Sequence, residues 1–137
     1  MAKLSANGLE GLEMSLRELA QLPDDVASEM LLAEAAVIKR AQRQKGEAYG
    51  VHRTGVTLSS ITHGKVKTEK DGKAVYVYPR GTNKNGARNS EVAFVNEYGK
   101  KGQPPRPFIR DANEAAADEA VGQAEKIYRQ WQDKNDL

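Results

Sequence analysis

Three prolines within four residues restrict the backbone of this chain more than any other feature. Residues 99–108 begin with a glycine and contain Pro104, Pro105 and Pro107. Each proline fixes φ near about −65° and favours extended geometry in the residue before it. Such a segment, named here the proline strap, has little conformational entropy to lose on folding. It should deliver Phe108 to a defined place, either as a connection that closes the core or as part of a contact surface.

The length and composition predict one soluble globular domain over residues 1–137. A chain of 137 residues can bury one modest core, and 39% of its residues are hydrophobic. The absence of cysteine excludes a disulfide framework and a thiolate metal site. No run of apolar residues is long enough to cross a bilayer, and we expect neither a secretory signal nor a membrane partner.

Charge is distributed unevenly along the sequence. Residues 52–110 contain twelve Lys or Arg against four Asp or Glu, whereas the rest of the chain contains nine against fifteen. A basic middle between acidic flanks fits a surface for a polyanion, or complementary faces through which copies of the protein meet head to tail. It also fits a solvated surface without a partner.

Apolar residues at helical spacing predict three helices. The first covers about residues 8–22, with leucines at positions 9, 12, 16 and 19, and the second follows Pro23 and ends before Gly46. The longest covers about residues 109–132, and its apolar stripe is rich in alanine, which permits close packing on another helix. Its members are Ile109, Ala112, Ala116, Ala120, Ala124, Ile127 and Trp131. Gly122 lies in the middle of this helix, and the only reason that we suggest for a glycine there is a close contact with a neighbouring element.

The middle of the chain predicts a β-hairpin. Strands at 65–69 and 74–79 flank residues 70–73, which contain an Asp-Gly pair typical of hairpin turns. Valines and tyrosines alternate in the second strand. A lone hairpin is marginal in water, so it needs a helix, a third strand or a strand from a neighbouring molecule.

Two further segments flank the hairpin. Before it, Thr54 is expected to cap a helical turn that carries Leu58 and Ile61. After it, residues 80–90 form a basic loop that we expect to be mobile.

The sequence offers little for catalysis. His52 and His63 lack the one-turn spacing of a helical metal pair, and Ser59 and Ser60 lack the context of an activated nucleophile. No glycine-rich loop joins a strand to a helix as phosphate cradles require. We therefore expect no enzyme, no metal and no cofactor. Nucleic-acid binding stays open, because the basic residues of the loop and the strap can contact phosphates.

Four motifs in order resemble the head–tail joining, or tail-completion, proteins of tailed bacteriophages. They are Thr54-Gly55 with Leu58, Ser60 and Ile61, a Val-Tyr-Val strand ending at Pro79, the run from Ala93 to Gly99, and Pro107-Phe108-Ile109 before an alanine-rich helix. The chain departs from the family pattern at Val92, Lys100 and Asp111. The similarity spans most of the sequence.

The resemblance implies an α+β fold with N-terminal helices, a small antiparallel β-sheet built on the hairpin and a long C-terminal helix packed on it. It also implies a non-enzymatic virion protein, made in the bacterial host, that forms a ring, commonly a hexamer, at the phage neck. Its partners would be copies of itself, the connector or stopper protein, the tail-tube protein and, nonspecifically, passing double-stranded DNA. The alternatives are a small basic nucleic-acid-binding protein and a minor tail subunit.

The loop and the strap provide the candidate residues for assembly. They are Arg80, Lys84, Arg88, Glu97, Tyr98, Lys100, Lys101, Arg106 and Phe108. Four of them have alternative roles inside one subunit. Phe108 is more simply a core residue, as Tyr98 also can be, and Glu97 can pair with Arg106.

Overall fold

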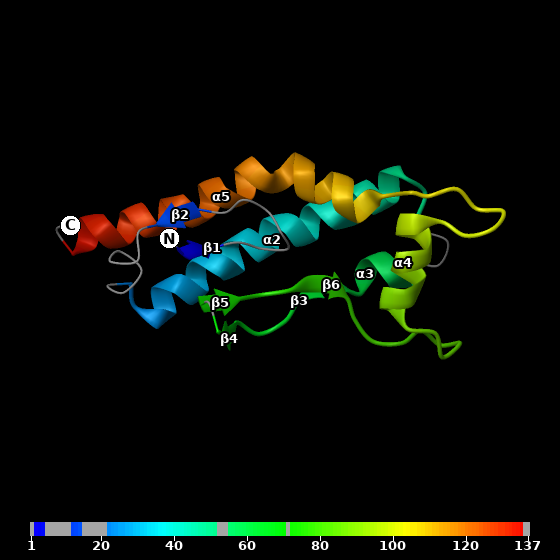
Figure 1. Ribbon diagram of the computed structural model, residues 1–137, viewed down its shortest axis with the longest axis horizontal. Coiled ribbons are helices and arrows are strands. Elements are labelled where there is room, and N and C mark those ends of the chain that lie inside the picture. Colours follow the sequence, from blue (N-terminus) through cyan, green and yellow to red (C-terminus); the bar gives the residue numbers. More distant parts are fainter. Residues whose placement is uncertain (1, 5–11, 15–21, 52–54, 71, 136–137) are drawn as a thin grey trace.

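Two long helices packed side by side run the length of this α+β protein (Figure 1). The computed structural model describes residues 2–4, 12–14, 22–51, 55–70 and 72–135. The helix α2 spans Asp24–Ala48, and the helix α5 spans Phe108–Lys134. A β-ribbon lies on the other side of α2, so α2 separates α5 from the ribbon (Figure 1). No helix in the described ranges is long and apolar enough to cross a membrane.

The charges at both ends of α2 suit a helix, but its C-terminal end lies beyond the predicted one. Asp24 and Asp25 lie in the first turn and Lys45 in the last, where each sign of charge stabilises the helix dipole. The sequence predicts an end before Gly46, but the helix continues to Ala48. Gly46 is buried against the short helix α3, Val56–Ser59, since a Cβ added there would lie 2.3 Å from Cδ2 of Leu58. The glycine therefore serves close packing, and the chain leaves the helix at Gly50, where φ is +79°.

The alanine stripe of α5 packs as predicted. Ala112, Ala116, Ala120 and Ala124 are all buried, and small side chains let α5 lie close to α2. Phe108 begins the helix and is completely buried, while Ile127 and Trp131 pack on the core near the other end. The predicted close contact at Gly122 is wrong, because a Cβ there would meet nothing within 4 Å.

The β-ribbon confirms the predicted hairpin and extends it. The pair β4 (Lys67–Glu69) and β5 (Gly72–Ala74) closes the turn, and β3 (Ile61–His63) pairs antiparallel with β6 (Val77–Pro79). The predicted first strand, 65–69, is shortened to β4, and the predicted second strand, 74–79, is interrupted at residues 75–76 between β5 and β6. Ile61 belongs to β3 instead of the preceding helix. That helix, α3, is only Val56–Ser59. The predicted cap, Thr54, lies outside the described residues.

The ribbon has a valine face and a tyrosine face, as the alternation of its residues predicts, and the structure shows that the two faces differ in burial. Val75 and Val77 are buried, whereas Tyr76 and Tyr78 are exposed. The helix α2 covers the buried face, so the ribbon has the helical partner that a two-stranded hairpin needs. Neither strand pair of the ribbon gains a third strand within the described residues.

The predicted helix over residues 8–22 is wrong at residues 12–14, which the structure describes. Residues Leu12–Met14 form the strand β2, which pairs antiparallel with β1 at Ala2–Leu4. The rest of the predicted helix, apart from Leu22, lies outside the described residues. The sequence of β2 also has the apolar–polar alternation of a strand, in Leu12, Glu13 and Met14. Its pairing with β1 stabilises the strand instead of the helix.

Candidate assembly surface

One short helix and the two segments beside it carry most of the candidate residues. The helix α4 spans Asn89–Tyr98, between the loop 80–88 and the proline strap. Figure 1 shows α4 at the end of the molecule that lies away from both labelled termini, with the loop and the strap extending past it. The sequence did not predict this helix. Its first two residues fall within the loop that the sequence predicts at 80–90.

Buried polar side chains hold α4 in place. Asn89, Ala93 and Glu97, four residues apart, form its buried side. The Asn89 backbone N–H donates to the Gly81 carbonyl at 2.9 Å, and its side-chain Nδ2 donates to the Arg80 carbonyl at 2.8 Å. The start of the helix is thereby tied to the start of the loop.

The opposite side of α4 exposes two aromatic rings. Phe94 is 63% exposed and Tyr98 is 66% exposed, and their ring centroids lie 4.7 Å apart. They are four residues apart and therefore share one side of the helix. The sequence analysis does not select Phe94 as a site residue, although a helix through residues 89–98 would place it four residues from Tyr98, on the same side.

The proline strap makes a tight turn next to Tyr98. The backbones of Lys100 and Gln103 exchange two hydrogen bonds, at 3.0 and 2.9 Å, which leaves Lys101 exposed at the tip. The strap then returns to α4, where the Arg106 N–H donates to the Asn96 carbonyl at 2.7 Å. A shallow hollow opens between the turn and the helix, lined by Tyr98, Gly99, Lys100, Gly102, Gln103, Pro104 and Pro105.

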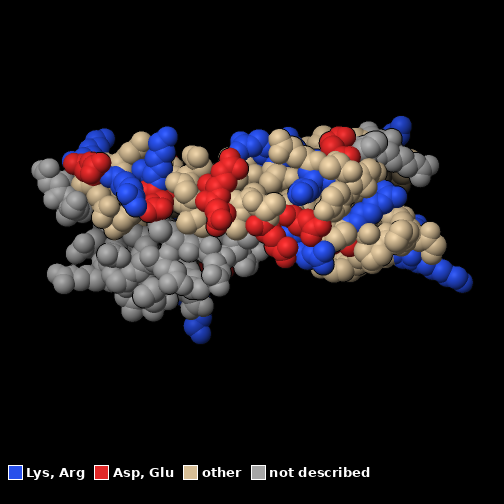
Figure 2. All heavy atoms as spheres, turned by 90° about the horizontal axis from the view of Figure 1, so that it is seen from above, with Lys and Arg blue, Asp and Glu red and all other residues tan. Residues whose placement is uncertain are grey.

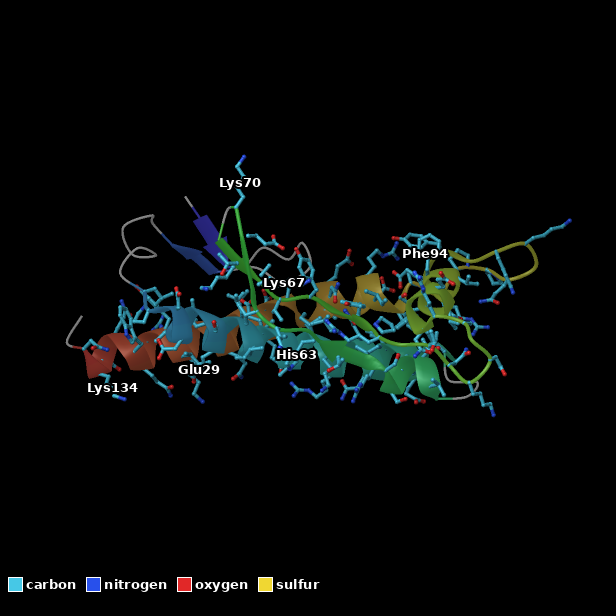
Figure 3. All side chains as sticks on the ribbon, turned by 90° about the horizontal axis from the view of Figure 1, so that it is seen from below. Glu29, His63, Lys67, Lys70, Phe94 and Lys134 are labelled. Carbon is cyan, nitrogen blue, oxygen red and sulfur yellow. The ribbon has the colours of Figure 1, made fainter. Side chains whose placement is uncertain are left out.

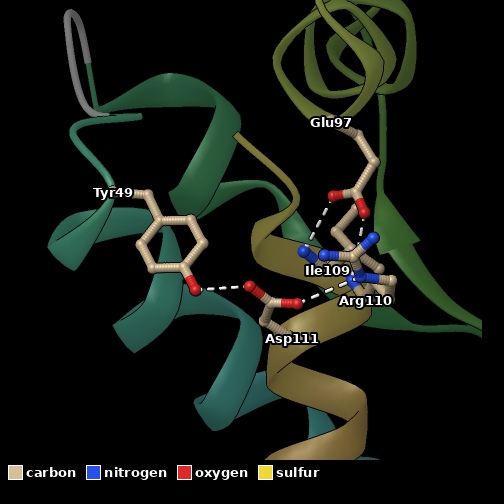
Figure 4. Close-up of polar contacts among 5 residues, drawn as sticks. All are labelled: Tyr49, Glu97, Ile109, Arg110 and Asp111. Carbon is tan, nitrogen blue, oxygen red and sulfur yellow. Dashed lines mark hydrogen bonds and ion pairs between the residues drawn. The ribbon is translucent and has the colours of Figure 1, made fainter. Parts of the chain in front are cut away.

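The Glu97 side chain forms its hydrogen bonds within its own subunit. Its carboxylate accepts hydrogen bonds from the backbone N–H groups of Ile109, at 2.8 Å, and Arg110, at 3.1 Å, at the start of α5 (Figure 4). The predicted pair with Arg106 is wrong, because Arg106 instead donates from Nη1 to the Gly50 carbonyl at 3.1 Å. The unpaired backbone N–H groups at the start of α5 offer the Glu97 carboxylate two donors, whereas the Arg106 guanidinium already donates to a carbonyl oxygen elsewhere.

The loop 80–88 is closed by its own hydrogen bonds. Asn83 Oδ1 accepts from the backbone N–H groups of Asn85 and Ala87, at 2.9 and 3.1 Å. Lys84 and Arg88 are exposed, whereas the Arg80 guanidinium lies 4.6 Å from the ring centroid of Tyr78. Mobility of this loop stays a prediction.

The structure therefore divides the nine predicted residues into groups. Tyr98, Lys100 and Lys101 lie together beside Phe94, at the C-terminal end of α4. Lys84 and Arg88 belong to the loop at the other end of this helix. The remaining residues face their own subunit. They are Arg80 and Arg106, which contact neighbouring groups of the chain, Glu97, which caps α5, and Phe108, which is core.

The acidic flank of the sequence includes the outer side of α5. Glu114, Asp118 and Glu119 are exposed there, and Figure 2 shows acidic side chains gathered midway along the face seen from above. Glu119 forms an ion pair with Arg40 of α2 at 2.9 Å. This acidic region is separated along the molecule from the basic turn of the strap.

The described residues contain no group of three or more His, Asp or Glu side chains that could hold a metal ion. Comparison with family models, curated proteins and solved structures found no match to this chain.

Proposed function

We propose that this chain is a structural subunit of a tailed-phage virion that assembles with copies of itself into a ring at the neck, joining the head to the tail. The proposal starts from the resemblance of four sequence motifs to head–tail joining proteins. Two of these motifs, the run ending at Gly99 and the segment around Phe108, enclose the proline strap.

The exposed pair of Phe94 and Tyr98 is the observation that carries the assembly role. Two large aromatic side chains in contact, both more than 60% exposed, form an apolar patch that gains free energy when a partner covers it. A basic turn on one side and a basic loop on the other frame this patch, as charged rims frame the apolar centres of protein interfaces.

The charges support a head-to-tail contact. The end of the molecule with α4 exposes Lys84, Arg88, Lys100 and Lys101, and the outer side of α5 exposes three acidic residues. Opposite charges on two different surfaces favour a heterologous interface, and such interfaces produce rings when the rotation closes. Six copies, the connector or stopper protein and the tail-tube protein are the expected partners, at the neck of the virion.

The mass of the protein in solution tests this proposal. We would measure it by light scattering after size exclusion, at low and high salt, with and without duplex DNA, and in parallel test whether the protein joins purified tails. A discrete ring-sized oligomer, or a monomer that ignores DNA but joins tails, is the expected result. The variant Phe94→Ser/Tyr98→Ser should lose this assembly, whereas Leu32→Ser, which removes an exposed apolar residue from α2, should keep it.

The second candidate function is nucleic-acid binding, which the four exposed basic residues around α4 favour. These residues can contact phosphates, and such binding weakens steeply as salt is raised. A protein that gains mass only with DNA, loses it in salt and never joins tails would overturn the neck proposal and support this alternative. A minor tail subunit would share the assembly surface and differ in its partners.

A further inference from the structure

A basic hollow lies on the outer side of α2, away from the assembly surface. It has a volume of about 250 Å³ and is lined by Ala36, Lys39, Arg40, Arg43 and Gln44 of α2 and by His63 of β3. The five helical residues recur at steps of three, one, three and one, so they form one stripe along the helix. Figure 3 shows His63 beside α2, apart from the labelled Phe94 and from Lys70 at the tip of the ribbon.

Arg43 is held rigidly in this hollow. Its Nη2 donates to the carbonyl oxygens of Ser59, at 3.0 Å, and Ile61, at 2.6 Å, and these two bonds join α2 to the residues around the start of β3. The Arg43 Nε is buried and has no hydrogen-bond partner. The guanidinium is therefore oriented in advance and retains hydrogen-bonding capacity that the chain does not use.

The other cationic side chains are available to a ligand. Lys39 makes no ion pair or hydrogen bond among the described contacts. Arg40 contacts Glu119 in an ion pair whose two side chains are both more than half exposed, and such a pair contributes little to stability. His63 has its Nδ1 2.9 Å from the Gly64 carbonyl oxygen, an acceptor, so Nδ1 donates this bond. In the neutral ring Nε2 is then an acceptor, which can take a hydrogen bond from the P–OH group of a protonated phosphate.

No acidic residue lines the hollow, and the one counterion among the described contacts of its cations is Glu119 of α5, which pairs with Arg40 from outside the hollow. Lys39 and Arg43 are four residues apart and Arg40 and Arg43 are three apart, spacings at which like charges on a helix repel one another. A bound anion would relieve this repulsion. The planar fork of an arginine matches the oxygens of a phosphate group, and a lysine adds a mobile point charge.

We propose that the hollow between α2 and β3 binds a phosphate group through Lys39, Arg40, Arg43 and His63. The group can belong to free phosphate or a small phosphate ester, or to the backbone of a nucleic acid. The site does not depend on the neck proposal, since it uses none of the residues of the assembly surface.

Calorimetric titration of the full chain with inorganic phosphate, at constant ionic strength maintained with chloride, tests the site. We expect saturable binding at one site per chain. The variant Lys39→Gln/Arg40→Gln should weaken it at least tenfold. The matched control is Lys126→Gln/Arg129→Gln, which likewise removes one lysine and one arginine that forms an ion pair, here with Glu125 of α5. This control should change the affinity less than twofold.

Side-chain NMR locates the ligand and identifies its source. Phosphate should shift the Arg43 Nε–H and His63 ring signals, and Arg43→Lys, which keeps the charge but removes the fork, should weaken binding. A short DNA duplex that shifts the same signals and is displaced by phosphate would identify a nucleic-acid backbone as a ligand. A response to phosphate alone would identify a small phosphate compound. The proposal is overturned if neither probe shows saturable binding, or if Lys39→Gln/Arg40→Gln binds as tightly as the unaltered protein.

Discussion

The carboxylate of Glu97, in the last turn of α4, accepts a hydrogen bond at 2.8 Å from the backbone N–H of Ile109, in the first turn of α5. Its second oxygen accepts from the N–H of Arg110. The start of α5 has no side-chain cap from its own N-cap residue, Pro107, so a glutamate on another helix supplies the missing acceptors and a negative charge. This contact fixes α4, and with it the aromatic pair, relative to the two long helices.

Replacing Glu97 should therefore destabilise the whole protein. Glu97→Ala leaves two N–H groups without acceptors in a nearly buried place, and we expect a loss of about 2 kcal/mol in the free energy of unfolding. Glu97→Gln keeps one acceptor oxygen and should cost about 1 kcal/mol. Urea unfolding measures both. The control Glu47→Gln changes an exposed glutamate of α2 and should stay within about 0.5 kcal/mol. Equal stabilities of Glu97→Ala and this control would contradict the capping role.

Two glycines should respond to alanine in opposite directions. Gly99 has φ of +79°, and a Cβ there would lie 2.8 Å from the Gln103 carbonyl oxygen and 2.9 Å from the Pro105 nitrogen, which are backbone atoms that cannot move aside. Gly99→Ala should cost at least about 1 kcal/mol. Gly122→Ala enters open space in the middle of α5 and should stabilise by about 0.5 to 1 kcal/mol. Thermal unfolding of both variants tests the pair. A destabilised Gly122→Ala would show that this side of α5 is more crowded than the structure indicates.

The buried carboxyl of Glu34 should make stability depend on pH. Burial raises the pKa of Glu34 from 4.5 to about 7, and its Oε1 has no hydrogen-bond partner. Because the unfolded chain ionises first, the folded state loses stability as pH rises from about 4.5 to about 7, by about 3 kcal/mol in total. Glu34→Gln does not ionise, so it should be more stable than the unaltered protein at pH 8 and nearly equal to it at pH 4.5. Urea midpoints at several pH values test this. A stability difference that does not change with pH would contradict it.

Tyr49 should control the ionisation of Asp111. The Tyr49 hydroxyl donates to Asp111 Oδ2 at 2.5 Å, and this bond, followed by the one from Arg110, lowers the pKa of Asp111 (Figure 4). Tyr49→Phe should raise that pKa towards its ordinary value. The lowered pKa contributes stability that is present at neutral pH and lost as the carboxylate is protonated in acid. The stability difference between the two proteins should therefore shrink at low pH. Carboxyl NMR titration measures the pKa directly, with Tyr76→Phe as a control that leaves it unchanged.

Local patterns in the sequence were sufficient for the elements that repeat over several turns or alternate cleanly. The alanine stripe of α5 is buried as predicted, and the valines that alternate with tyrosines in the predicted second strand form the buried face of the ribbon. Each element has a period that only one secondary structure satisfies, and burial follows from which side is apolar. The Asp-Gly turn likewise identified the hairpin.

Short elements could not be identified in this way. The buried stripe of α4 consists of Asn89, Ala93 and Glu97, two of them polar, while its aromatic residues Phe94 and Tyr98 point outward. Its pattern therefore does not resemble that of a core helix. The pairing of β1 with β2 depends on residues about ten positions apart in the sequence, which helical spacing within residues 8–22 does not reveal.

The sequence by itself determined the two long helices and the hairpin, because local periodicity and turn chemistry specify them, and the α+β class was what the family resemblance implied. Only the tertiary structure decided the roles of single side chains. It turned Glu97 into the cap of α5 and Phe108 into core, left Phe94 and Tyr98 exposed together, and placed His63 beside the basic stripe of α2. These roles depend on which groups from distant parts of the chain come within hydrogen-bond or van der Waals distance, and that is a property of packing.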